Sequence, residues 1–488
     1  MEWSDCSVIL EALTNPKRSG CRTSRSVATL SVSGGGKARF MVQTLTNAFL
    51  EAFSRTLLQA VVTSGRRERH GGKLPRMLVV QLVLAMALRP DRSITAVLEE
   101  LVEIVGAPAN WRGVLPKPSS ITAARDRLGW EPLRHAFFEH ASGLDGGARW
   151  LQDLRVAALD ATTFRTPDSP ENEAAFGRPG GRKPAGYPMI RCLCLVDVFD
   201  HTVLAATFGP YKGPGSGELS LAKNHLLDRL PQNTVILMDR GFCSYDWLRT
   251  LAAREIPFVV RLKTGKNTVK PITREVLSGR NDRLVEFPVP NSYSPKAGAE
   301  PISLRRIKWT VPKQRMKRKS KRKRRARKQT LPLAQRNAPK TRHVELLTNL
   351  VDHEAFPWWE TAQLYLRRWE VEFAFREIKS TLTNRKVEFR SKRPRRVLQE
   401  AYALLLAYNM LRQRMAEAAH RRKLVPTDLS FTDCLHAIRR AYVRGSPVSP
   451  MLTQLSGYVL PKRDRRWYPR AVKARSKSYP TKQVASAA

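Results

Sequence analysis

Five short apolar segments, separated by turn signals and helical patterns, constrain the fold of this 488-residue chain more than any other feature. The segments are 154–160, 190–198, 202–208, 234–238 and 257–262. Apolar runs of this length that alternate with helical segments are typical of a mixed α/β sheet. We therefore expect such a sheet, with Asp200 and His201 in a hairpin turn between its second and third strands.

Two of these apolar segments lead into an aspartate. Asp160 closes the first segment, and Asp239 directly follows the fourth. In open α/β sheets, ligand sites collect where strands end, so we expect both side chains at such a position. Aspartate is also a common turn residue, and taken alone each position fits that interpretation as well.

A long helix is predicted for residues 360–382, which contain no Gly or Pro and follow Pro357. At about 100° per residue, the apolar side chains form one stripe with a polar face beside it. That polar face carries Tyr365, Arg368, Glu372 and Lys379. A carboxylate between cations suits metal-assisted chemistry on a nucleic-acid backbone. The spacing also fits ordinary surface ion pairs, because Glu372 lies four residues from both Arg368 and Arg376.

The formal net charge of +44 indicates a polyanionic partner, and nucleic acid is the leading candidate. A membrane is not expected, because the longest apolar run, 77–88, is too short to span a bilayer. The six cysteines include no Cys-x-x-Cys pair, which disfavours a zinc site or a disulfide framework. These features are typical of a reduced, cytoplasmic protein that binds DNA or RNA.

The segments on either side of the predicted sheet differ from it in composition and in apolar periodicity. Residues 1–40 lack an apolar period and are expected to be disordered, with Met41 as a hypothetical start of translation. The next hundred residues have helical periodicity, with a helix capped by Ser119 or Ser120. A basic cluster around Arg66 and Arg67 suits a helical DNA-binding domain. The almost wholly basic stretch 315–328 is typical of a loop that binds phosphates.

Taken in order, these motifs resemble those of DDE transposases of the insertion-sequence-four family. The matching motifs are Tyr365-x2-Arg368-x3-Glu372-x6-Lys379 for the family's helix signature, Asp160-Ala-Thr-Thr for its first aspartate, and Asp239-Arg240-Gly241-Phe242 for its second. The resemblance covers roughly residues 41–419. It implies an α/β fold: an RNase H-like catalytic domain with a β-rich insertion, preceded by a small all-α domain and followed by C-terminal helices.

The resemblance and the composition of the segments outside it together predict a division of the chain. The expected regions are a disordered segment (1–40), a helical DNA-binding domain (41–148), the catalytic domain in two parts (149–264 and 351–420), the β-rich insertion (265–350) with a basic loop (313–343), and a C-terminal helix with a basic tail (421–488). Strand cleavage at insertion-sequence ends and transfer of the freed 3′-hydroxyl into target DNA would be the reaction. A nuclease that does not join strands and a non-catalytic basic DNA-binding protein are the alternatives.

The roles of individual residues follow from the same resemblance. Asp160, Asp239 and Glu372 would be catalytic and would bind two divalent cations, magnesium or manganese. The residues expected to bind DNA are Tyr365, Arg368, Lys379, Arg66, Arg67 and Arg240. The partners would be double-stranded DNA, as terminal inverted repeats and target, and a second copy of the chain in a homodimer. The protein would work at the nucleoid of a bacterial cytoplasm.

Overall fold

The computed structural model describes residues 74–461, apart from 109–110, 112–113, 145–147, 181–184, 266–267, 291–299, 313–340, 386 and 445–446. Its strands are β1 (Arg155–Arg165), β2 (Met189–Asp197), β3 (Val203–Pro210), β4 (Thr234–Met238), β5 (Phe258–Arg261), β6 (Ile272–Ser278), β7 (Asp282–Phe287), β8 (Ile302–Pro312) and β9 (Thr341–Thr348). Its main helices are α5 (Arg76–Leu88), α6 (Ile94–Val105), α7 (Pro118–Leu128), α8 (Glu131–Ser142), α9 (Pro170–Phe176), α10 (Glu218–Leu221), α11 (Tyr245–Ala253), α14 (Trp358–Leu366), α15 (Glu370–Arg376), α16 (Pro394–His420), α17 (Phe431–Arg444) and α18 (Val448–Leu455).

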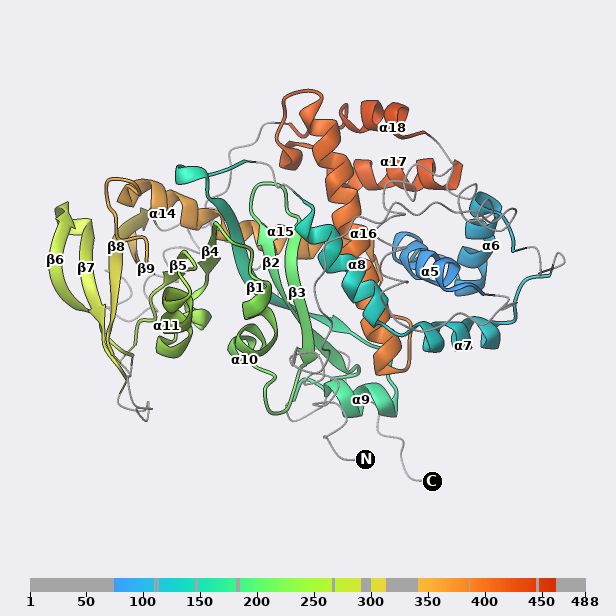
Figure 1. Ribbon diagram of the computed structural model, residues 1–488, viewed down its shortest axis with the longest axis horizontal. Helices are drawn as coiled ribbons and strands as arrows, with labels where there is room; N and C mark the ends of the chain where they lie inside the picture. Colours follow the sequence, from blue (N-terminus) through green and yellow to red (C-terminus); the bar gives the residue numbers. More distant parts are fainter. Residues whose placement is uncertain are drawn as a thin grey trace, which may run out of the picture.

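The strands form one sheet in the order β3-β2-β1-β4-β5-β9-β8-β7-β6 (Figure 1). β1 pairs with β2 in antiparallel fashion and with β4 in parallel, and β5 continues the parallel side. The turn between β2 and β3 contains Asp200 and His201, as predicted, and His201 has a φ of 65°. The prediction of a mixed α/β sheet is therefore confirmed, and its strands match the five apolar segments.

Helices cover both faces of this sheet because side chains alternate along each strand. Ala157 and Leu159 of β1 face the core that contains α11 and the end of α10. Val156 and Ala158 face the opposite core, which α8, α15 and α16 complete. The result is a layered α/β structure in which the helix that carries Glu372 packs directly against β1.

The insertion extends the same sheet beyond β5. β9 pairs antiparallel to β5, and β8, β7 and β6 follow in turn at the end of the sheet shown on the left of Figure 1. Within the described residues of this region, β6, β7, β8 and β9 agree with the expected β-rich insertion. β6 was not predicted, because its residues are exposed and mostly polar. The basic stretch 315–328 lies outside the described residues.

The N-terminal helices pack on α16 and share a single apolar core with it. Arg125 of α7 is buried and donates to Gln399 (2.8 Å) and Glu400 (2.9 Å), both on α16. The capping prediction was wrong, because Ser119 and Ser120 lie inside α7. That helix begins at Pro118, whose fixed φ and missing N–H suit the first helical turn.

Several predictions fall on residues that the structure does not describe: the segment 1–40, the helix expected after Met41, and Arg66 and Arg67. The region boundaries also stay predictions. Within the described ranges, no helix is both long enough and apolar enough to cross a bilayer.

Candidate active site

The signature segment forms one helical run over residues 358–382 that begins directly after Pro357, as predicted. The run is not a uniform α-helix. A 3-10 turn at Arg367–Trp369 separates α14 from α15, and the last six residues, Glu377–Leu382, form a π turn. Such departures change the angle between successive side chains and are often found at functional sites.

The apolar stripe of this run is buried throughout, as predicted. Its members are Leu364, Val371, Phe375, Ile378 and Leu382. The polar face is less uniform than the ideal geometry predicts. Tyr365 and Arg368 are buried, whereas Glu372 is exposed. Arg368 lies in the 3-10 turn itself, which separates Tyr365 on α14 from Glu372 on α15, so a constant 100° step does not describe this face.

Asp160 lies on β1, and Asp239 directly follows the neighbouring strand β4. Asp160 lies inside β1, which continues to Arg165, so the prediction that it ends a strand was wrong. β1 continues because its antiparallel pairing with β2 extends to Arg165, whereas its parallel pairing with β4 ends at Leu159 and Met238. Asp160 is the next residue of β1 and Asp239 is the residue directly after β4, so both lie where the parallel pairing stops.

The electrostatics of Asp160 fit a site for a hard cation. Burial, together with the negative charges of Asp239 and Glu218, raises the pKa of this carboxyl to about 6 against the opposing effects of the Ala161 N–H and of Arg368. A pKa raised by neighbouring carboxylates means that the ionised groups repel one another. Divalent cations with a preference for oxygen ligands, such as Mg²⁺ or Mn²⁺, would relieve that repulsion.

Arg368 contacts β1 as well as its own helical run. Its Nη1 lies 3.6 Å from Oδ2 of Asp160, and its guanidinium stacks 4.6 Å from the ring centroid of Trp369. The side chain is buried, so a solvated surface ion pair does not describe it. Among the described residues, its Nε has no hydrogen-bond partner. A buried guanidinium with an unused donor suits a phosphate oxygen beside the two aspartates.

Tyr365 lies in the same electrostatic environment. Burial raises the pKa of its hydroxyl to about 12, although the charges of Arg368 and Arg261 oppose this, so the group stays protonated and can donate. Arg261, the last residue of β5, was not among the predicted site residues. The rule that ligand sites collect at strand ends, applied to this strand, would have found it.

Lys379 is directed at β1. Its Nζ donates to the carbonyl of Thr163 (2.6 Å) and lies 3.4 Å from the hydroxyl of Thr162, just beyond Asp160. Burial lowers the pKa of this ammonium group. In this structure Lys379 links the end of the helical run to the strand of the first aspartate, and its contact with DNA stays a prediction.

Glu372 does not complete a set of three carboxylates here. In the part of the chain that the structure describes, no three His, Cys, Asp or Glu side chains are placed to share a metal ion. Glu372 lies on α15, which packs against β1, and its side chain is exposed. Joint binding of cations by Asp160, Asp239 and Glu372 therefore stays a prediction that requires the Glu372 side chain to turn.

Two further charged residues border the aspartates. Arg240 is exposed directly after Asp239, and its contact with DNA stays a prediction. Glu218, at the start of α10, accepts a hydrogen bond from Nη1 of Arg191 (2.7 Å), and its negative charge helps to raise the pKa of Asp160. No sequence signal identified Glu218, because its position depends on how α10 packs against the sheet.

Comparison with known proteins identifies the family. Residues 151–410, more than half of the chain, match the family model described as "Transposase DDE domain", and residues 42–138 match "Insertion element 4 transposase N-terminal". The chain is 31% identical over 447 residues to "Transposase InsG for insertion sequence element IS4" of Escherichia coli (strain K12), an alignment that covers 88% of this chain and 91% of InsG. The chain belongs to the DDE transposases of the insertion-element-4 family.

A second relative supports the same assignment over a shorter stretch. The transposase is 34% identical over 139 residues to the E. coli K12 protein named "Putative transposase InsZ". This alignment covers 27% of this chain and 45% of InsZ. Membership confirms the predicted family and the RNase H-like fold of the catalytic domain, and it makes the chain an enzyme. Transposases act on DNA, and DDE transposases generally use divalent metal ions.

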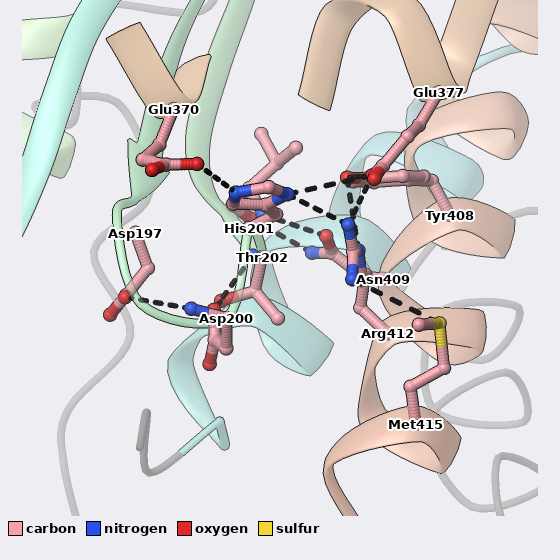
Figure 2. Close-up of polar contacts among 11 residues, drawn as sticks. Asp197, Asp200, His201, Thr202, Glu370, Glu377, Tyr408, Asn409, Arg412 and Met415 are labelled. Carbon is pink, nitrogen blue, oxygen red and sulfur yellow. Dashed lines mark hydrogen bonds and ion pairs between the residues drawn. The ribbon is translucent and has the colours of Figure 1, made fainter. Parts of the chain in front are cut away.

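A buried polar network, the His201 network, fixes the helix of the transposase that carries Glu372 (Figure 2). His201 lies between Glu370 of α15 and Arg412 of α16, with 3.0 Å from Nε2 to Glu370 and 2.7 Å from Nδ1 to Arg412. Because the arginine can only donate, Nδ1 accepts and Nε2–H donates to Glu370. The turn between β2 and β3 is thus tied to α15 close to Glu372.

The same network ties α16 to the helical run. Arg412 forms an ion pair with Glu377, and Tyr408 donates to Glu377 (2.7 Å) while accepting from Nε of Arg412 (3.2 Å). Asn409 bonds both the N–H and the carbonyl of Val203, at 2.8 Å each, at the start of β3. Buried charges left without partners are costly, so each member depends on the others.

Replacing Gly241 with alanine is expected to reduce DNA cleavage with little change in stability. The Gly241 N–H donates to Oδ1 of Asp239 (2.6 Å), and a Cβ at this position would lie 2.8 Å from that oxygen. The Asp239 carboxylate must shift, and a displacement of about 1 Å can cost on the order of 100-fold in rate. Cleavage assays and thermal melting would measure both effects.

Gly180→Ala is the matched control, because no atom lies within 4 Å of an added Cβ there. It should leave cleavage unchanged. If Gly241→Ala cleaves as fast as the parent, the position of Asp239 in this structure is not the one used in catalysis.

Proposed function

We propose that this transposase cleaves DNA strands at the ends of its insertion sequence and transfers the freed 3′-hydroxyl into target DNA. The adjacency of Asp160 and Asp239, with the pKa of Asp160 raised to about 6, carries the proposal. Two carboxylates that repel each other beside a buried arginine form a site that is incomplete without added positive charge and a phosphate.

Asp160, Asp239 and Glu372 would hold two divalent cations, magnesium or manganese. Bound there, paired ions would stabilise the attacking and leaving oxygens of a phosphodiester displacement. The chain's own cations have a different task. Arg368 would donate through its unused Nε to a phosphate oxygen, and Tyr365, still protonated, would donate beside it.

The substrates proposed are duplex DNA with terminal inverted repeats and a separate target duplex. Two ends must be cut and joined together, so we propose a homodimer in the complex that holds both ends. The net charge of +44 supports non-specific affinity for the target. Such a substrate places the protein at the nucleoid of a bacterial cytoplasm.

A strand-transfer assay tests the reaction. The full chain is mixed with a labelled duplex that carries the inverted repeat and with a supercoiled plasmid, in Mg²⁺ or in EDTA. We expect labelled 3′ ends joined to the plasmid in Mg²⁺ and neither cleavage nor joining in EDTA. Cleavage without joined product would indicate a nuclease of the same fold, and binding without cleavage would indicate a non-catalytic DNA-binding protein.

A further inference from the structure

A basic groove lies outside the candidate active site, where three distant segments meet. It has a volume of about 480 Å³ and lies between the turn that joins α5 to α6, the turn after the helical run 358–382, and α17. We call it the α17 groove. Its charged lining residues include Arg89, Arg385, Arg439, Arg440, Arg444 and Asp91. Tyr365, Arg368, Lys379 and the proposed catalytic carboxylates are not part of this lining.

Arg439 fixes the base of the α17 groove. Its Nε donates to the carbonyl of Leu88 at the end of α5 (2.7 Å), and its Nη2 donates to the carbonyl of Leu382 at the end of the helical run (2.8 Å). One guanidinium thus holds all three segments together. Burial lowers the pKa of Arg439, and the charge of Arg89 lowers it further, against the effect of Asp91. The groove is therefore preorganised and strongly positive.

The positive charge of the groove is only partly balanced. Arg89 pairs with Glu100 (2.9 Å) and Asp91 (3.5 Å). Arg385, Arg440 and Arg444 are exposed, and no carboxylate in the described ranges forms an ion pair with them. Several exposed arginines beside the fixed, half-buried Arg439 can contact successive phosphates of a nucleic-acid backbone, whereas a single small anion would engage only part of this charge.

We propose that the α17 groove binds backbone phosphates of the duplex DNA on which the transposase acts, away from the phosphate that is cut. This inference rests on the proposed function only in taking duplex DNA as the substrate. The groove begins where the helical run that carries the signature ends, so a duplex at the active site can continue toward it. α17 lies beyond residues 42–138 and 151–410, so neither family match covers it.

The test is equilibrium binding of the full chain to the inverted-repeat duplex in EDTA, over a series of salt concentrations. The double variant Arg440→Ala/Arg444→Ala should bind on the order of tenfold more weakly, and the slope of log affinity against log salt should fall by about two. Arg440→Lys/Arg444→Lys keeps both charges and should retain most of the slope. Because no metal and no cleavage are involved, a failure of the proposed reaction would not affect this result.

The matched control removes two exposed arginines far from α17, as Arg254→Ala/Arg280→Ala. Arg280 lies in the turn between β6 and β7, at the opposite end of the molecule from α17 (Figure 1). Unchanged affinity and slope in the α17 variant would overturn the proposal, as would an equal loss in the control. If the double variant fails to fold by circular dichroism, Arg385→Ala provides the same test with a slope change of about one.

Discussion

The transposase with Asp239 replaced by asparagine should cleave DNA at least about 1,000-fold more slowly than the parent, because the proposed site for divalent cations would lose a charged ligand worth several kcal/mol to the reaction. Asparagine retains the Oδ1 that accepts from the Gly241 N–H, so the local turn is kept. Asp160→Asn and Glu372→Gln are expected to act in the same way. Cleavage of a labelled duplex in Mg²⁺ measures the loss, and binding in EDTA shows that the DNA-bound state survives.

Glu218→Gln is the control for this series, because Glu218 also acts on Asp160 yet is engaged by Arg191. It should have a much smaller effect. Full activity in any of the three carboxylate variants would remove that residue from the catalytic set. For Glu372 the result is especially informative, because this side chain is exposed and has to turn toward the aspartates.

Replacing Arg412 with methionine is expected to lower the free energy of unfolding by about 3 to 5 kcal/mol, since it leaves Glu377 ionised without its buried partner. Although burial raises the pKa of Glu377, the charge of Arg412 and the contacts of His201 and Tyr408 lower it to about 2. A lowered pKa means that this ion pair stabilises the fold above about pH 4.5, and that the contribution is lost as the pH falls toward 2. Urea unfolding at several pH values measures both effects.

The double variant Glu377→Leu/Arg412→Met removes both charges and should be much closer to the parent in stability. A single Arg412→Met variant as stable as the parent would show that Glu377 finds another partner or takes up a proton at little cost.

Much of the fold follows from periodicity. The five apolar segments became β1 to β5, because a strand buried on both faces is apolar along its whole length. β6 was not predicted, because it is exposed. The start of α7 was predicted at the wrong residue, because the helix begins at Pro118 and not at the serines that follow it. Local patterns thus identify buried elements better than exposed ones.

Only part of the candidate site could be predicted from the sequence. Motif order identified Asp160, Asp239 and Arg368, but strand register decides how they meet, and register is not visible in local patterns. Asp160 was expected at a strand end. It lies inside β1 because the pairing of β1 with β2 is longer than its pairing with β4. Glu218 was missed for the same reason. His201 was read as a turn residue, which is correct, but its partners Glu370 and Arg412 are distant in sequence.

The His201 network also determines where the catalytic unit can be cut. The family match ends at residue 410, and Arg412 lies just past that boundary. A fragment trimmed to the match would retain Glu377 and His201 but lose the guanidinium that both contact. Expression of the isolated catalytic part should therefore succeed only when the whole of α16 is included.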